Sequence, residues 1–123
     1  MKTVLLIEDN KDIRENTYEI LTLEGYDVIA SANGINGLAL AKENLPDIIL
    51  CDIWMPGLNG YEVFENLKKD TNTLNIPFIF LTASADKNEV ETGLGMGANG
   101  YIRKPIEHDT LINEIELCLN ALI

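Results

Sequence analysis

Short apolar segments alternate with segments of helical periodicity five times along this chain of 123 residues. The apolar segments, which are expected to be strands, cover residues 3–7, 26–30, 48–51, 78–81 and 101–103. The other segments are expected to be helices at residues 11–23, 34–44, 60–69, 86 to the glycines at 93–97, and 109–120. Such alternation is typical of βαβ units with right-handed crossovers, and it predicts a single α/β domain built around a parallel sheet.

The third predicted strand is apolar without interruption from residue 48 to residue 51, between Asp47 and Asp52. An unbroken apolar run is expected of a strand that is buried on both faces of a parallel sheet. The second strand carries Asp27, so we expect it nearer the edge of the sheet. Asp52 follows the buried strand at its carboxyl end, where open α/β sheets bind ligands. This stretch alone is equally compatible with a ligand site and with an acid that merely ends a strand at the surface.

Polar residues predict where several helices begin. Asn10 and Asn59 are suitable caps for the first and third helices. Asp86, followed three residues later by Glu89, resembles a capping box at the start of the fourth helix, whose end should be weakened by its glycines. The residues at helical spacing in the second helix are Ile35, Leu38, Ala39 and Leu45. The last helix has a wide apolar stripe, formed by Leu111, Ile112, Ile115, Cys118, Leu119 and Leu122.

The chain is acidic, with a net charge of −11. This charge argues against direct binding to nucleic acid or to an anionic membrane, because the phosphates would repel it. No apolar run approaches the roughly 20 residues that span a bilayer, and no signal peptide precedes the first strand. The two cysteines, Cys51 and Cys118, show no metal-ligand spacing and are expected to be reduced thiols. A cytoplasmic protein is therefore expected.

Ionisable and hydroxyl side chains follow four of the predicted strands. Glu8 and Asp9 follow the first, Asp52 the third, Thr82 the fourth and Lys104 the fifth. Because the carboxyl ends of parallel strands meet at one edge of the sheet, these side chains are expected to converge there. Three close carboxylates repel one another, and a hard divalent cation such as Mg²⁺ relieves that repulsion.

Such a site predicts phosphoryl transfer. An aspartate beside Mg²⁺ stays ionised, so Asp52 could attack a phosphoryl donor and form an aspartyl phosphate. Mg²⁺, Lys104 and the Thr82 hydroxyl would stabilise the phosphoryl oxygens. Each of these residues alone could equally be an ordinary surface acid, helix cap or lysine, but a chance placement of all of them at strand ends is far less probable.

Around these residues the sequence resembles the receiver domain of two-component response regulators over essentially its whole length. The matching motifs are Glu8-Asp9, Pro46-Asp47 leading to Asp52, Met55-Pro56-Gly57 with Gly60, Thr82-Ala83, Gly97-Ala98 with Gly100-Tyr101, and Lys104-Pro105. The resemblance implies a receiver domain over residues 1–123 with a doubly wound, flavodoxin-like sheet. Its five parallel strands would follow the order 2-1-3-4-5, which is known from this family, with five flanking helices.

The resemblance also implies a function. Asp52 would accept a phosphoryl group from the phosphohistidine of a sensor histidine kinase or phosphotransfer protein. Glu8, Asp9 and Asp52 would hold Mg²⁺, with the backbone carbonyl of Trp54 as a further ligand. Lys104 and Thr82 would assist the reaction. The domain would be a regulatory switch, and it would catalyse only its own phosphorylation and dephosphorylation.

In this family the hydroxyl at the Thr82 position moves toward the phosphoryl group, and the aromatic ring at the Tyr101 position then turns inward. The resulting surface of the fourth helix, fifth strand and fifth helix would control a partner, an output domain or a second copy of the chain. Trp54 and Ser84 are expected at the rim of the site. The Lys104-Pro105 bond resembles a pair that is cis in the family, although the sequence does not fix its isomer.

Three other functions stay open at this point. A phosphatase of the haloacid dehalogenase type would place a second acid two residues after Asp52, where this chain has Trp54. A flavodoxin-like electron carrier would need a phosphate-binding first loop, and Glu8 and Asp9 would repel that phosphate. A receiver-like module that is never phosphorylated would not need the complete set of acids, although Glu8 is longer than the more usual aspartate.

Overall fold

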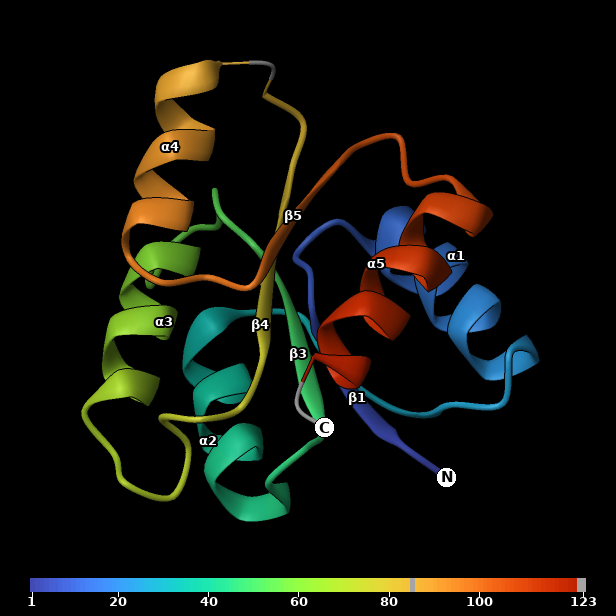
Figure 1. The fold of residues 1–123 in the computed structure, drawn as a ribbon, viewed down its shortest axis with the longest axis horizontal. Coiled ribbons are helices and arrows are strands. Elements are labelled where there is room, and N and C mark those ends of the chain that lie inside the picture. Colours follow the sequence, from blue (N-terminus) through green and yellow to red (C-terminus); the bar gives the residue numbers. More distant parts are fainter. Residues whose placement is uncertain (85, 122–123) are drawn as a thin grey trace.

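A computed structural model describes residues 1–84 and 86–121 of the chain (Figure 1). Five parallel strands form one sheet in the order β2-β1-β3-β4-β5. The strands are β1 (Thr3–Ile7), β2 (Asp27–Ser31), β3 (Ile48–Asp52), β4 (Phe78–Thr82) and β5 (Gly100–Arg103). The helices are α1 (Lys11–Leu23), α2 (Gly34–Asn44), α3 (Gly60–Lys68), α4 (Lys87–Gly95) and α5 (His108–Asn120). The predicted fold class, strand order and edge position of β2 are therefore confirmed.

The helices cover the sheet in two layers (Figure 1). Helices α1 and α5 pack on one face, and α2, α3 and α4 pack on the other. Because neighbouring residues of a strand point to opposite faces, β3 places Leu50 in the core beneath α1 and α5 and Cys51 in the core beneath α3. Both β3 and β4 are buried along their whole length, as expected of central strands in a parallel sheet.

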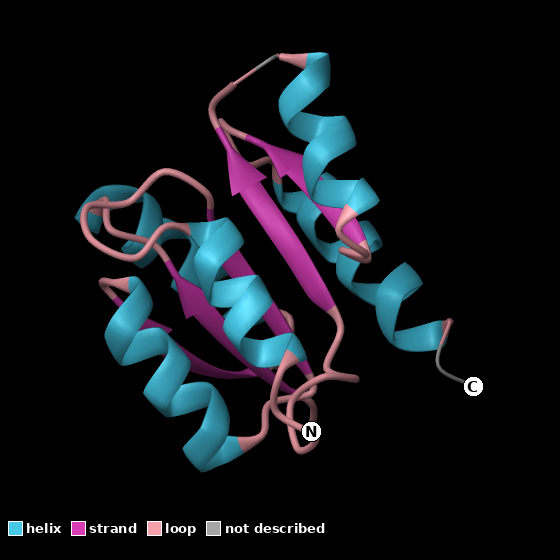
Figure 2. Ribbon diagram, turned by 90° about the vertical axis from the view of Figure 1, so that its left-hand side faces the viewer, coloured by secondary structure: helices cyan, strands magenta, loops and turns pink. Residues whose placement is uncertain are grey.

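The parallel register brings four strand ends to a single edge, and the strand arrows in Figure 2 run in the same direction. The Cα partners nearest this edge are Ile7 with Cys51, Asp52 with Leu81, and Thr82 with Arg103. Glu8 follows Ile7 directly and Lys104 follows Arg103 directly. The topology therefore brings the backbone of Glu8, Asp52, Thr82 and Lys104 to the same edge of the sheet.

Side-chain caps fix the start of four helices, and Asn33 caps α2 by accepting from the backbone N–H of Asn36. Asn10 caps α1, and Asn59 forms a complete capping box with Glu62 at the start of α3. Asp86 caps α4 through its own side chain. The predicted capping box of α4 is wrong, because the carboxylate of Glu89 is bonded to other side chains and does not return to the cap.

The buried face of α2 is not the one that the helical spacing of its apolar residues suggests. Of its four predicted apolar residues, only Leu38 packs on the core, whereas Ile35 is 71% exposed and Leu45 is 52% exposed. Gly37 faces the sheet instead, and a Cβ there would lie 2.5 Å from the Cδ1 atom of Ile7. The helix lies so close to β1 that only a small residue fits at the contact. A pattern of large apolar residues therefore does not reveal this face.

The apolar stripe of α5 is confirmed for Leu111, Ile112, Ile115 and Cys118, which are buried. Leu119 is partly buried against the same core, and Leu122 lies outside the described residues. Within residues 1–84 and 86–121, none of the helices combines the length and the apolar character needed to span a bilayer.

Gly60, the first residue of α3, has no room for a side chain. A Cβ there would lie 2.4 Å from the carbonyl oxygen of Asp52 and 2.8 Å from the Cα atom of Ile53. We expect Gly60→Ala to lower the free energy of unfolding by about 1–3 kcal/mol, because backbone atoms must move apart. Gly95 is the matched control, because a Cβ there would meet nothing within 4 Å. Gly95→Ala should leave the stability unchanged or raise it by up to about 1 kcal/mol. Equal urea midpoints for the two variants would contradict this prediction.

Candidate functional site

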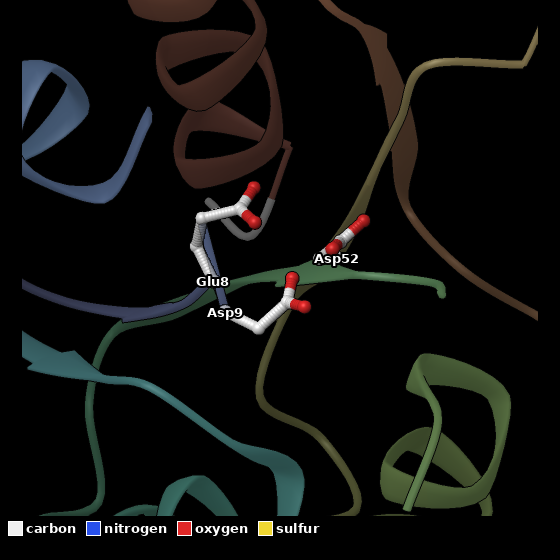
Figure 3. Close-up of side chains that lie close together, drawn as sticks. All are labelled: Glu8, Asp9 and Asp52. Atoms are coloured by element: carbon white, nitrogen blue, oxygen red, sulfur yellow. The ribbon is translucent and has the colours of Figure 1, made fainter. Parts of the chain in front are cut away.

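Three acidic side chains gather at the carboxyl ends of β1 and β3 (Figure 3). Glu8, Asp9 and Asp52 each offer a carboxylate oxygen that lies within 4.8 Å of the other two. Glu8 and Asp52 are buried, whereas Asp9 is exposed. The structure thus brings together the three acids that the sequence places at separate strand ends.

Lys104 lies against this acidic cluster. Its Nζ atom is 2.5 Å from Glu8 Oε1 and 3.2 Å from Asp52 Oδ1. The other oxygen of Glu8 accepts a hydrogen bond of 3.1 Å from the backbone N–H of Asn10. The peptide bond between Lys104 and Pro105 is cis. One ammonium group therefore contacts two of the three carboxylates, and it offsets only part of the charge of the cluster.

The environment of Asp52 makes its ionisation unfavourable. Burial raises the pKa of Asp52, the charge of Glu8 and a hydrogen bond with Asp9 raise it further, and Lys104 opposes them, so that the pKa is about 7. Burial alone would lower the pKa of Lys104, but its hydrogen bond to Glu8 and the charges of Asp52 and Glu8 outweigh burial and raise it. The cluster therefore has an excess of negative potential and favours the binding of an additional cation.

Thr82 is the last residue of β4, the strand next to the one that carries Asp52. Its hydroxyl is buried and donates a hydrogen bond of 2.5 Å to Glu89 Oε1. The hydroxyl oxygen of Thr82 also accepts a hydrogen bond of 3.1 Å from the backbone N–H of Ser84. The hydroxyl of Ser84 in turn accepts from the N–H of Asp86, at 3.1 Å. Thr82, Ser84 and Asp86 are therefore linked by hydrogen bonds next to the start of α4.

Glu89 is a residue of this edge that sequence analysis missed. Besides Thr82, its carboxylate accepts hydrogen bonds of 3.1 Å from Tyr101 Oη and 3.1 Å from Trp54 Nε1. Burial alone would raise the pKa of Glu89, but the hydrogen bonds from Thr82, Trp54 and Tyr101 outweigh burial, and the pKa is lowered. Its position in the first turn of the helix that follows β4 is the sequence signal that places it near the strand ends.

A row of aromatic rings runs from Trp54, in the loop after β3, to Tyr101 in β5. Trp54, which is 58% exposed, meets Tyr61 edge-on with ring centroids 5.8 Å apart. Tyr61 contacts Phe80 at 5.3 Å, and Phe80 contacts Tyr101 at 6.1 Å. A Cβ on Gly93 would come within 2.9 Å of Phe80 and 3.1 Å of Tyr101. Gly93 thus lets α4 pack directly on the two rings, in addition to any weakening of the helix end.

Arg14, another residue that sequence analysis missed, supports the backbone of the acidic loop. Its Nη1 atom donates to the backbone carbonyl of Glu8 at 2.9 Å and to that of Asp9 at 3.4 Å. The contact comes from α1, one turn after its first residue. The Arg14 guanidinium therefore holds the backbone of Glu8 and Asp9.

Comparisons with known proteins agree with this arrangement. The family described as the response regulator receiver domain matches residues 4–116. Protein PilH of Pseudomonas aeruginosa is 34% identical over 119 residues, which cover 97% of this chain and 98% of PilH. The transcriptional regulatory protein AfsQ1 of Streptomyces coelicolor is 38% identical over 119 residues, which cover 97% of this chain but only 52% of AfsQ1. The chain therefore spans the whole of some relatives and about half of others.

Solved structures show the same likeness. Chemotaxis protein CheY4 of Vibrio cholerae superimposes with a TM-score of 0.91 at 28% identity, covering 97% of this chain and 99% of CheY4. The receiver domain of the sensor histidine kinase PA1611 of Pseudomonas aeruginosa has a TM-score of 0.89 at 30% identity, covering 97% of this chain and 98% of that domain. That structure holds a magnesium ion coordinated in its active-site cleft.

Proposed function

Because this chain belongs to the response regulator receiver domain family, whose general function is phosphorylation-dependent two-component signalling, we propose that Asp52 is its phosphoryl acceptor. The donor would be the phosphohistidine of a sensor histidine kinase or of a phosphotransfer protein. The observation that supports the proposal most strongly is the buried contact of Asp52 with Lys104 beside two further acids. A buried carboxylate with a raised pKa and a specific charged partner is characteristic of functional sites.

The proposed reaction uses side chains of this edge. An ionised oxygen of Asp52 attacks the phosphorus, the bond from phosphorus to the donor nitrogen breaks, and its electron pair leaves with the imidazole. Lys104, already 3.2 Å from Asp52, stabilises the charge that develops on the phosphoryl oxygens. Thr82 donates a hydrogen bond to a phosphoryl oxygen once its hydroxyl is released. The domain would act on no outside substrate, and it would catalyse only its own phosphorylation and dephosphorylation.

The acidic cluster fits a magnesium ion. Carboxylate oxygens from Glu8, Asp9 and Asp52 are the hard ligands that Mg²⁺ prefers. Burial and the nearby charge of Glu8 raise the pKa of Asp52, and a bound cation would favour its ionised form. The proposed ligands are these three carboxylates and the backbone carbonyl of Trp54. Bound magnesium would keep Asp52 ionised and neutralise charge on the phosphoryl oxygens.

Thr82 and Tyr101 are the proposed switch residues, and Trp54 and Ser84 form the rim of the site. Phosphorylation would shift these residues together with α4, and the surface of α4, β5 and α5 would control a partner, an output domain or a second copy. We infer that the protein acts in the cytoplasm, where its two free cysteines would stay reduced. It includes no direct binding to nucleic acid or membrane, because the net charge of −11 would oppose both.

The test is incubation with acetyl phosphate and magnesium, followed by intact-mass and peptide mass spectrometry. We expect one base-labile phosphoryl group on Asp52, and none when the metal is chelated. A phosphoryl group on another residue, or no labelling under any condition, would contradict the proposed function.

Magnesium affinity should depend on pH in a predictable way. Because the pKa of Asp52 is about 7, most molecules below that pH hold a proton that the cation must displace. Apparent affinity should therefore rise as pH increases to about 7, by up to about tenfold per unit, and level off above it. The fluorescence of Trp54, the only tryptophan, is the readout. An affinity that stays constant between about pH 5.5 and 8 would contradict the raised pKa, and a silent signal would argue against metal near Trp54.

A further inference from the structure

One carboxylate holds side chains from three separate segments at the edge of the site. Glu89 Oε1 accepts from Thr82 at the end of β4 and from Tyr101 in β5, and Oε2 accepts from Trp54 in the loop after β3. The backbone carbonyl of Glu89 also accepts from Tyr61 Oη, at 3.3 Å. Glu89 therefore fixes the first turn of α4 against the candidate site.

The bond to Thr82 occupies a group that the proposed reaction needs. A threonine hydroxyl has a single proton to donate, and that of Thr82 is given to Glu89. The hydroxyl oxygen also accepts from the backbone N–H of Ser84. Thr82 therefore cannot donate to a phosphoryl group on Asp52 while it donates to Glu89.

Neither capping nor metal binding accounts for Glu89. Asp86 already caps α4, and the acids that gather for a cation are Glu8, Asp9 and Asp52. Three neutral donors on one carboxylate form charge-assisted hydrogen bonds, which are stronger than bonds between neutral groups. Three such bonds to one carboxylate are expected of a residue whose role is to hold Thr82, Tyr101 and Trp54 in place.

We propose that Glu89 is a positioning residue that holds Thr82 and Tyr101 in their unphosphorylated arrangement and releases the Thr82 hydroxyl when Asp52 is phosphorylated. The inference rests on the proposed function, since it assigns Glu89 a part in the response of the same site. A phosphoryl group adds negative charge and strong acceptor oxygens. Thr82 then has a better acceptor, and Glu89 experiences repulsion from a like charge. Because Tyr101 and Trp54 are bonded to the same carboxylate, its displacement frees both and loosens α4.

Glu89→Gln tests the proposal, because it keeps the size of the side chain and removes its charge. Glu91→Gln, at an exposed position of the same helix, is the matched control. We expect Glu89→Gln to raise the initial rate of labelling by acetyl phosphate about three- to tenfold, since less free energy is needed to release Thr82. Glu91→Gln should stay at the wild-type rate. A rate for Glu89→Gln equal to or below that of Glu91→Gln would overturn the proposal, because loss of a merely structural contact would not accelerate labelling.

A double-mutant cycle shows whether the faster labelling of Glu89→Gln depends on the Thr82 hydroxyl. In a Thr82→Ala background, Glu89→Gln should raise the rate less than about twofold, because the shared proton is gone. An equal gain in both backgrounds would mean that Glu89 acts only as a nearby charge, and the assignment would be wrong.

A measurement on unlabelled protein separates failure of this inference from failure of the proposed function. In ¹⁵N-enriched protein that has not been phosphorylated, Glu89→Gln should move the Trp54 indole N–H resonance and speed amide exchange in α4, whereas Glu91→Gln should do neither. Unchanged spectra would overturn the role of Glu89 even if wild-type protein is phosphorylated. If Glu89→Gln shows the expected spectral change but the wild type is not labelled, the proposed response of Glu89 to phosphorylation would be overturned. The proposed function would then also be unsupported.

Discussion

Replacing Asp52 with asparagine should abolish phosphorylation and also make the protein more stable above pH 7. The pKa of Asp52 rises from the ordinary value of 3.8 to about 7 in the folded protein, so the folded state binds this proton more tightly than the unfolded chain does. The contribution of this proton to folding is complete below the ordinary pKa and is lost as pH rises through about 7. Asparagine carries no charge at any pH, so it avoids that loss.

Urea unfolding as a function of pH measures the effect. At pH 8 we expect Asp52→Asn to be more stable than the wild type by about 1–3 kcal/mol, less than the full shift implies because a contact with Lys104 is weakened. The gain should shrink toward zero as pH falls to about 4, which provides an internal control. It should also shrink in magnesium, because only the wild type has the complete cluster to bind it. Lower stability than wild type at pH 8, or labelling that survives the substitution, would contradict the account of this site.

Lys104→Met should have the opposite effect on stability while also suppressing phosphorylation. Its ammonium is the positive charge within 3.2 Å of both Glu8 and Asp52, and the Lys104 side chain is only 11% exposed. Removing one partner leaves buried carboxylates without compensation, which costs about 3–5 kcal/mol in comparable cases. The labelling rate should fall by about 10²-fold or more, because the group that stabilises the transferring phosphoryl oxygens is lost.

The surface ion pair of Lys2 provides the matched control. Lys2 Nζ lies 4.0 Å from Asp47 Oδ1, and its side chain is 62% exposed. Lys2→Met should therefore change the stability by no more than about 1 kcal/mol. Lower pH and added magnesium should each restore part of the stability of Lys104→Met, since both relieve the repulsion. If the two lysine variants were equally stable, Lys104 would not be neutralising the buried acids.

The positions of the strands and of the acidic cluster could be predicted because several local signals agree along the chain. An unbroken apolar run such as residues 48–51 is compatible with a buried parallel strand, and Asp52 directly after it must then stand at the carboxyl edge. The register of the sheet then brings the site residues together, because it aligns the ends of β1, β3, β4 and β5.

The contacts of Glu89 could not be predicted, because its sequence position fits two arrangements. Three residues after Asp86, it could return to the helix cap or turn toward the sheet, and only the neighbouring hydroxyl, phenol and indole donors decide between them. The helical spacing of the apolar residues in α2 did not identify its buried face, for a related reason. Gly37 makes the close contact, and a residue without a side chain leaves no hydrophobic signal.

The layout of the chain ends has a practical consequence. β1 begins at the amino edge of the sheet, and α5 runs back along β5, so that the end of the helix lies near the same edge (Figure 1). An affinity tag or fused protein at either end would therefore leave the acidic edge open to a docking kinase. A peptide inserted in the loop after β3 would cover that edge instead, so immobilisation for binding assays should use the ends.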